Sequence, residues 1–394
     1  MDFKFTEEQV QFREEVKEFV TTEKEKGIFP FGNNCWMHLS SMEFSKEVAK
    51  NGLIGIAWPK EHGGRGMGYV DRVIMLEEMF RAGAPVAYHF MADRQVAPGI
   101  IHFGSDFLKK EFLPKIRNAE VCFCLLFSEP DAGSDLANCR TTAVEEGDYY
   151  IVNGQKVWTS NGHIADYGWA LVKTNLDPAV SRYNAFSEMV IDMKSPGVTV
   201  RPLINSAGAH SFNEVYFDNV KVPKEYLVGT KDNGFRQIMT NLDFERAGIE
   251  RLMQNSLTLD SLKDYVKTND KGGKPLSQDP LIRDSIAKLE IEFEVGKLFI
   301  YYVASLLDKG KIPSYEAAMG KTFCTLYEAK LADVATTLMG LPGLLMPGSP
   351  EAPCNGMACE DYLWSPSYTL QGGVVEVLKN IVAQRGLKLG RKKK

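Results

Sequence analysis

Two polar segments, each following a strand-like pattern, place the strongest constraint on how this chain folds. The first, Phe127 to Asp135, reads F-S-E-P-D-A-G-S-D and follows an apolar run from Val121 that is typical of a buried strand. Pro130 and Gly133 turn its backbone sharply, which suits a loop that approaches a ligand closely. The second, Val157 to Gly162, reads V-W-T-S-N-G and combines an indole with two hydroxyls.

Together the two segments have the chemistry to hold a flat heteroaromatic ring such as a flavin. The indole of Trp158 can cover one face of the ring, and the hydroxyls of Thr159 and Ser160 and backbone amides can bond its edge. The alternative interpretation is a strand end with a polar turn and a core tryptophan. Spacing alone leaves both open.

Composition and charge exclude several classes of function. The chain has 394 residues, a net charge of −5 and 25% charged residues, so nucleic acid is not an expected partner. No apolar run reaches about 18 residues, and the N-terminus does not resemble a signal peptide, so we predict no membrane span and a cytoplasmic location. The seven scattered cysteines are interpreted as reduced thiols, and none of the six histidines lies in a metal-ligand spacing, so we predict no metal.

The order of local patterns is helices, strands, helices. Thr6 to Gln9 has the form of a capping box, which marks a helix start, and helical periodicity continues to about residue 120. From Val121 to about Val228 the chain alternates with period two, as strands do. Helices return from Gly229. We therefore predict a helical domain over 1–120, a β domain over 121–228 and a helical domain over 229–394.

Two local predictions are specific enough to test against the structure. Asn153-Gly154 suits a type I′ turn, so we predict a hairpin between 148–152 and 155–159. Continuous helical periodicity predicts one long helix from Ile238 to Leu257.

The motifs S-E-P-x-A-G-S-D and N-G-x-K-x-W-T-S-N-G resemble the flavin-contacting strands of the acyl-CoA dehydrogenase family, and the resemblance covers essentially the whole chain. It implies an α+β multidomain fold with an N-terminal helical domain, a middle β-barrel-like domain and a C-terminal four-helix-bundle domain. It also implies FAD as cofactor, an acyl-CoA substrate from fatty acid or aromatic acid catabolism, and electron-transfer flavoprotein as acceptor. Family members are usually homotetramers.

The resemblance also bears on the base that removes the α-proton. Many members carry it as the Glu of a C-terminal E-G-T segment, but the aligned position here is Gly372. A branch resembling isovaleryl-CoA and long-chain dehydrogenases carries it in an earlier L-D-x-E-R motif, which this chain has at residues 242–246. A glycine at position 372 and a glutamate at position 245 are both consistent with this second branch, so we predict Glu245 as the catalytic base.

Other site residues follow from the same resemblance. Arg94, near the expected floor of the acyl pocket, is a candidate for a substrate carboxylate or, alternatively, a packing arginine. The predicted cofactor-binding residues are Phe127, Ser128, Ser134, Trp158, Thr159, Ser160, Lys271, Gly340 and Gly343. The predicted substrate-binding residues are Ser134, Asp243, Phe244, Arg246 and Arg94. The enolate oxygen would be held by a backbone N–H at Gly373 or nearby and by a ribityl hydroxyl.

One segment departs from the family pattern. The usual R-x-x-F-G-K, which binds the FAD pyrophosphate across a subunit interface, has Asn269 for the Arg and Gly272 for the Phe. Lysine is not a bidentate equivalent of arginine. The chain is therefore either a homo-oligomer (tetramer or dimer) that holds FAD differently or one subunit of a heteromer. An enoyl-CoA reductase and a non-catalytic partner subunit are the alternative functions. The acyl group, whether branched, cyclic, aromatic or dicarboxylic, is left open.

Overall fold

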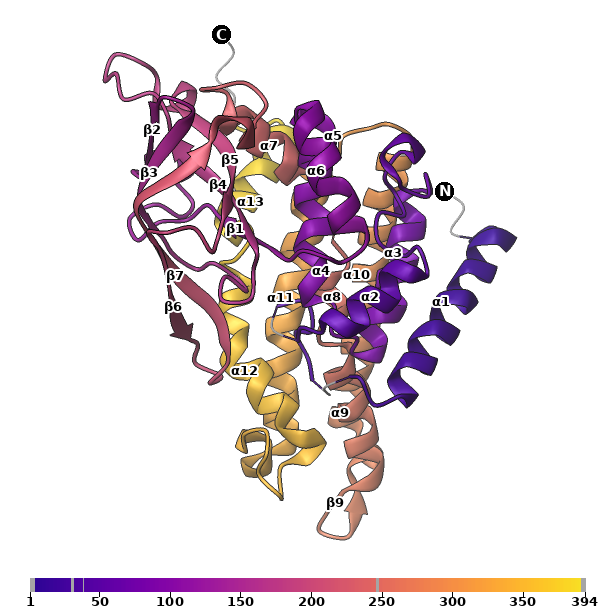
Figure 1. The fold of residues 1–394 in the computed structure, drawn as a ribbon. Coiled ribbons are helices and arrows are strands. Elements are labelled where there is room, and N and C mark those ends of the chain that lie inside the picture. The colour runs from indigo at the N-terminus through magenta and orange to yellow at the C-terminus, as the bar shows by residue number, and fades with distance from the viewer. Residues whose placement is uncertain (1–3, 30–31, 38, 246–247, 391–394) are drawn as a thin grey trace. The chain divides into compact units, whose positions relative to one another are not determined.

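The computed structural model describes residues 4–29, 32–37, 39–245 and 248–390, and the side chains of 241–245 and Lys271 lie outside the described part. Backbone packing divides the chain into two compact units, each described by itself. Unit 1 contains Met1–Cys35, Tyr69–Ala84 and Arg246–Lys394, and unit 2 contains Trp36–Gly68 and Pro85–Glu245. Helices, strands and helices follow one another along the chain as predicted (Figure 1). The exact domain boundaries stay a prediction.

Unit 1 is built mainly from helices, with a short two-stranded antiparallel sheet of β9 (Asp270–Lys271) and β10 (Lys274–Pro275). Its α-helices within the described residues are α1 (Glu7–Glu25), α3 (Tyr69–Ala82), α8 (Glu250–Met253), α9 (Ser256–Thr268), α10 (Pro280–Asp308), α11 (Tyr315–Met339), α12 (Met357–Tyr368) and α13 (Val375–Ile381). The predicted capping box is confirmed, because Gln9 N donates to Thr6 Oγ1 and Thr6 N donates to Gln9 Oε1. Helices α10 and α11 pack side by side (Figure 1).

The long helix predicted from Ile238 to Leu257 is wrong. Residues of that stretch belong to three helices, α7 (Gly234–Glu245), α8 and α9. Gly248 and Asn255, which have low helix propensity, lie at the two breaks. The Asn255 amide donates instead to the hydroxyl of Tyr368 at 3.2 Å, a buried partner that is distant in sequence.

Unit 2 contains an eight-stranded sheet with the order β6-β7-β3-β2-β4-β5-β8, and β1 pairs in parallel with β4. The strands are β1 (Phe123–Leu126), β2 (Thr142–Glu146), β3 (Tyr149–Lys156), β4 (Tyr167–Lys173), β5 (Phe186–Asp192), β6 (Val198–Ile204), β7 (His210–Pro223) and β8 (Leu227–Val228). The α-helices of this unit are α2 (Met42–Lys50), α4 (Ala87–Met91), α5 (Ala97–Phe103), α6 (Asp106–Arg117) and α7.

The hairpin predicted at Asn153-Gly154 is also wrong. Both residues lie inside the continuous strand β3, where the pairing with β7 shifts register at a bulge. A Cβ at position 154 would lie 2.6 Å from Thr141 Oγ1, and φ there is +146°, so this close approach requires glycine. The hairpin is formed instead by β2 and β3, and the turn between these two strands contains Gly147 at φ +56°.

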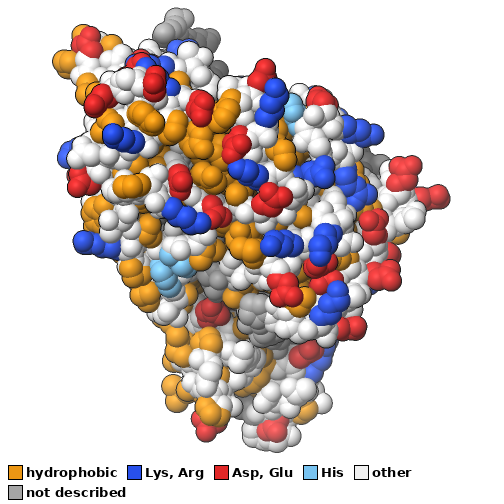
Figure 2. Space-filling view, in the orientation of Figure 1, with side chains coloured by type: hydrophobic (Ala, Val, Ile, Leu, Met, Phe, Trp, Pro, Cys, Tyr) orange, Lys and Arg blue, Asp and Glu red, His pale blue; other side chains and the backbone are white. Residues whose placement is uncertain are grey.

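The surface and the thiols are ordinary for a globular protein. Basic and acidic side chains are interspersed on the face shown in Figure 2. All seven cysteines are free thiols. Within the described residues, none of the helices has the length and apolar character needed to span a membrane.

A fully buried ion pair ties together the ends of β1 and β3. Lys156 Nζ donates to Glu129 Oε1 at 2.8 Å, to Phe127 O at 3.0 Å and to Leu171 O at 2.7 Å. Burial alone would raise the pKa of Glu129. The Lys156 ammonium, the Thr141 hydrogen bond and the backbone N–H of Arg140 outweigh burial and hold that pKa below its ordinary value. The pair therefore stabilises the fold above the ordinary carboxyl pKa, and this contribution is lost as the pH falls through the folded value.

Lys156→Met should lower the free energy of unfolding by about 3–5 kcal/mol at neutral pH, because it leaves the Glu129 carboxylate buried without its cation. The difference from the natural chain should shrink below about pH 4.5. Urea unfolding at several pH values measures both effects. Lys194→Met, which breaks an exposed pair with Asp166, is the control and should cost at most about 1 kcal/mol. Equal stability of the two variants would contradict this role.

Candidate active site

The structure brings the two predicted flavin-contacting segments together in unit 2. Val157 N donates to Ser128 O at 2.9 Å, and Lys156 holds the carbonyl of Phe127. Phe127 and Ser128 are half-buried at the end of β1, directly beside the turn that begins at Trp158. Ser134 is exposed on the loop that follows, next to Asp135, which pairs with Arg182 at 3.1 Å.

The Trp158 turn fits a flat ring with polar edges. Trp158 is 61% exposed and adopts φ +59°, and Asn161 adopts φ +57°, conformations that cost non-glycine residues of order 1–3 kcal/mol. The hydroxyl of Thr159 is buried and has no hydrogen-bond partner among the described residues, and Ser160 is half-buried. A strained turn with an exposed indole and an unsatisfied hydroxyl suits the isoalloxazine of FAD.

Asn213, a residue that sequence reasoning missed, fixes this turn. Its backbone carbonyl accepts from Thr159 N at 3.0 Å, and its amide donates to Thr159 O at 3.0 Å. The same side chain bonds His163 and His210, whose rings stack 3.9 Å apart. These contacts give His163 a structural role, and the only sequence signal for Asn213 was a polar residue at an inward position of β7.

Helix α7, which carries Asp243, Phe244 and Glu245, is anchored at its start. A Cβ on Gly234 would lie 2.6 Å from the carbonyl carbon of Ser187 in β5, so only glycine allows this approach. The side chains of residues 243–245 and the whole of Arg246 lie outside the described part.

A buried carboxyl group links α7 to the sheet. Glu188 in β5 accepts from Trp169 Nε1 at 2.7 Å and from Gln237 Nε2 of α7 at 3.1 Å. Burial raises the pKa of Glu188 to about 7, although the two hydrogen bonds oppose the rise. The same Gln237 amide also donates to Val228 O at 3.1 Å. These contacts set the orientation of the helix that carries the predicted base.

Arg94 lies in a π-helical segment, η2 (Ala92–Val96), that packs against α7 within unit 2. Its guanidinium lies 5.5 Å from the ring centre of Trp36 and 5.2 Å from that of Phe90. Both amide atoms of the adjacent Gln95 are buried and have no partner among the described residues. Single π-helical turns are frequent at functional sites, and Gln95 is a polar group that the sequence did not single out.

The position aligned with the family's C-terminal glutamate lies in unit 1 and has a constrained backbone. Gly372 adopts φ +62° and Gly373 adopts φ +108°. A Cβ on Gly372 would lie 2.5 Å from Nη2 of Arg251, and Lys321 Nζ donates to Gly373 O at 2.8 Å. Position 372 therefore offers no base and little space for one.

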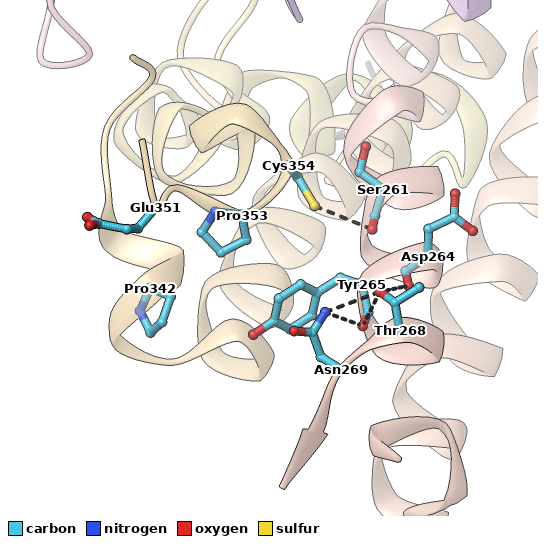
Figure 3. A pocket seen from close by; sticks show the side chains of 9 residues that line it. All are labelled: Ser261, Asp264, Tyr265, Thr268, Asn269, Pro342, Glu351, Pro353 and Cys354. Atoms are coloured by element: carbon cyan, nitrogen blue, oxygen red, sulfur yellow. Dashed lines mark hydrogen bonds between the residues drawn. The ribbon is translucent and has the colours of Figure 1, made fainter. Parts of the chain in front are cut away.

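Unit 1 also has a pocket of about 590 Å³ between α9 and the segment that contains Pro342 and Cys354 (Figure 3). The ring of Tyr265 and the amide of Asn269 lie between these walls in that view. The described residues that line the pocket are Ser261, Asp264, Tyr265, Thr268, Asn269, Pro342, Glu351, Pro353 and Cys354. Gly340 and Gly343 flank Pro342 in sequence and are not part of this lining.

This pocket does not fit the pyrophosphate that the family pattern places near Asn269. The lining has two carboxylates, Asp264 and Glu351, and no Lys or Arg among its described residues. The amide of Asn269 is already used, because Nδ2 donates to Tyr265 O at 3.0 Å and to Thr268 Oγ1 at 3.2 Å. The residues of the Trp158 turn in unit 2 fit a flavin ring. The residues that line the pocket at Asn269 do not fit the pyrophosphate of an FAD bound to a second subunit.

Comparisons with known proteins agree with this geometry. The family models for the acyl-CoA dehydrogenase N-terminal, middle and C-terminal domains match residues 6–120, 124–220 and 232–387. The acyl-CoA dehydrogenase IpdE1 of Mycobacterium tuberculosis is 32% identical over 89% of this chain and 88% of its own length.

Two solved structures resemble the whole chain. The Tcur3481-Tcur3483 steroid ACAD has a TM-score of 0.88 at 25% identity, and the ChsE4-ChsE5 complex of Mycobacterium tuberculosis has a TM-score of 0.86 at 30% identity. Both cover 100% of each chain. The chain belongs to the acyl-CoA dehydrogenase family. Its activity is that of a flavin-dependent acyl-CoA dehydrogenase, with the N-terminal helical, middle β and C-terminal helical domains of that fold.

Gly234→Ala should lower the free energy of unfolding by about 1–3 kcal/mol, because the added methyl meets the β5 backbone, which cannot move aside as a flexible side chain can. Thermal unfolding by circular dichroism measures the change. Gly320→Ala in α11 is the matched control, since its nearest contact would be an ordinary 3.7 Å and alanine favours the helix by up to about 1 kcal/mol. A Gly234→Ala protein as stable as this control would contradict the anchoring of α7.

Proposed function

We propose that the chain dehydrogenates the α and β carbons of an acyl-CoA thioester with Glu245 as the base. Bound FAD supplies the acceptor for the β-hydride, and electron-transfer flavoprotein is the proposed electron acceptor. The observation that carries this assignment is the combination of residue types at two positions. Glu245 lies on α7, and position 372 is a glycine whose side-chain space is taken by Arg251. This supports the branch of the family that carries its base on the earlier helix.

The roles of the chain's own residues follow from this assignment. Glu245 removes the α-proton, and burial beside an acyl chain would raise its pKa toward the working pH. With FAD bound, the exposed indole of Trp158 would cover a ring face and exclude water, and the buried hydroxyl of Thr159 would gain a hydrogen-bond partner. The backbone N–H groups near Gly373 would stabilise the developing enolate oxygen.

Glu245→Gln should reduce the limiting rate of flavin reduction by about 10²–10⁴-fold, because an amide cannot accept the proton. FAD content and CoA-ester binding should be retained. Anaerobic stopped-flow bleaching of the FAD-loaded holoenzyme measures the rate. Glu376→Gln is the matched control, since Glu376 is exposed on α13 and its variant should keep the natural rate. Near-normal reduction by Glu245→Gln would end the assignment.

We infer further that the working enzyme is a heteromer that acts on a ring-bearing, steroid-type thioester. Two whole-length structural neighbours carry paired names, and one is described as a steroid ACAD. The pocket at Asn269 has no Lys or Arg among its described lining residues, which supports the proposal that a different subunit supplies the arginine for the FAD pyrophosphate. The buried amide of Gln95, beside Arg94, would bind a polar substituent on the acyl group.

Purified alone, the chain should retain much less than one FAD per subunit. Asn269→Arg should tighten FAD binding about tenfold, because a bidentate guanidinium replaces an amide that is already bonded. Absorbance of dialysed protein measures FAD content, and Asn269→Gln is the control that should change nothing. A full complement of FAD in the natural chain by itself would contradict the heteromer proposal.

A further inference from the structure

A buried hydrogen-bonded contact joins helix α7 to the sheet of unit 2. Glu188 of β5 is 0% exposed, and Gln237, near the start of α7, is 2% exposed. Glu188 Oε2 accepts from Gln237 Nε2 at 3.1 Å, and Glu188 Oε1 accepts from Trp169 Nε1 of β4 at 2.7 Å. We call these three residues the Glu188 contact.

The direction of each hydrogen bond in the Glu188 contact is fixed. Gln237 Nε2 also donates to Val228 O at 3.1 Å, and Gln237 Oε1 accepts from Thr230 N at 3.4 Å, so turning this amide over would lose both bonds. The indole N–H of Trp169 can only donate. Both oxygens of Glu188 therefore face donors, which matches a carboxylate. A glutamine at position 188 would not match, because its amide nitrogen would face another donor.

The backbone around this contact fits as closely as the side chains. A Cβ on Gly229 would lie 2.3 Å from Gln237 Oε1, and a Cβ on Gly234 would lie 2.6 Å from the carbonyl carbon of Ser187. Between these two glycines, Asp232 N donates to Ser187 Oγ at 2.8 Å. The first turn of α7 therefore has a fixed position on β5.

The same helix packs against the first of the two predicted flavin-contacting segments. Ile238 of α7 is buried in one apolar cluster with Ala132, which lies in that segment, and with Cys139, which follows it. Phe127 packs against this cluster. The Glu188 contact thus fixes the helix relative to that segment, and the helix ends at Glu245.

Stability does not account for a carboxyl group at this place. Burial raises the pKa of Glu188 from its ordinary value of 4.5 to about 7, against the effect of its two hydrogen bonds. Because the folded pKa is the higher one, the contribution of this group to stability is present below about pH 4.5 and is lost as the pH rises through about 7. Ionising Glu188 thus costs folding free energy, and buried groups of this kind are frequent at functional sites.

No cation offsets this cost among the contacts that the structure describes for Glu188. The groups that face it are the indole of Trp169 and the amide of Gln237, and Val228 of β8 pairs with it through the backbone. The carboxylate is therefore held by neutral donors alone. The charged residues on the connection from β8 to α7 have other partners: Lys231 pairs with Glu145, and Asp232 with Thr174 and Asn175.

We propose that Glu188 is a positioning residue of the reaction. As a carboxylate it holds α7, through Gln237, at the place on the sheet from which the base reaches the α carbon of the substrate. Glu188 acts through the helix and not on the substrate itself. The proposal rests on the proposed function, because that function gives α7 the base.

The first test is Glu188→Gln, which keeps the shape of the side chain and replaces one acceptor with a donor. At pH 8, the limiting rate of flavin reduction in the FAD-loaded holoenzyme should fall about ten- to a hundredfold, because the base is displaced from the α carbon. The dissociation constant of the acyl-CoA should change less than about threefold. Glu146→Gln, the same change at an exposed position of β2, is the control and should keep the rate of the natural chain. An unchanged rate in Glu188→Gln would overturn the proposal.

Thermal unfolding of the same variants separates positioning from structural damage. Glu188→Gln loses one hydrogen bond but also removes a costly buried charge, so its melting temperature should stay within about 4 °C of the natural value. A loss of rate that comes with a larger loss of melting temperature would indicate structural damage and would contradict the positioning role.

Gln237→Met tests the same contact from the helix, and it takes the place of Glu188→Gln if that variant does not fold. It removes the donor on α7 and keeps the carboxylate, so it should also lower the limiting rate about tenfold or more. Because both changes break one hydrogen bond, the double variant should be no slower than the slower single variant. Losses that multiply would show that Glu188 does not act through Gln237.

One further pair of measurements separates this proposal from the proposed function. If Glu245→Gln reduces flavin at the natural rate, the proposed base is wrong and the proposed function fails. A crystal structure of Glu188→Gln still tests the contact, because it should show α7 displaced by about 1 Å or more while β5 keeps its position. An undisplaced α7 would overturn the proposal, whichever residue is the base.

Discussion

The buried Lys156–Glu129 pair is the interaction on which the cofactor side of this enzyme depends. The ammonium is completely enclosed and must satisfy its donors locally, since an unpaired buried charge is very costly. Its partners are the Glu129 carboxylate and two backbone carbonyls, that of Phe127 directly after β1 and that of Leu171 in β4. The segments around Phe127 and Trp158 therefore cannot separate without exposing or orphaning this charge. Asn213 holds the strained Trp158 turn from the other side, so both of the predicted flavin-contacting segments have fixed positions in unit 2.

Three departures from the family pattern have a common physical theme. Gly372 stands where many family members have a carboxylate, Nη2 of Arg251 lies where its side chain would begin, and the pocket at Asn269 has no Lys or Arg among its described lining residues. The first and the third concern a charged side chain that the family pattern has at one position and this chain does not. The first two support the proposed assignment of proton transfer to Glu245 on α7. The third supports the proposal that a different subunit supplies part of the cofactor site.

Local patterns predicted the elements whose partners are local. The Thr6–Gln9 capping box and the alternating strands follow from neighbouring residues, and the structure confirms them. The hairpin at Asn153-Gly154 and the long helix through Asn255 failed for a shared reason. Gly154 lies against Thr141 on the β2 side of β3, at a bulge in the pairing with β7, and Asn255 bonds Tyr368, which is 113 residues away. Turn and helix propensities contain no information about such partners.

The sequence by itself determined the family and the glycine at position 372, where many family members have a glutamate, and it predicted the two segments that contact the flavin. These conclusions depend only on which residues occur and on the spacing between them, and both can be read directly from the sequence. Only the tertiary structure decided that Arg251 occupies the space beside Gly372, that Asn213 holds the Thr159 turn, and that the Asn269 amide is already bonded. A sequence states which donors, acceptors and charges exist, but packing decides which of them are paired and which remain available for chemistry.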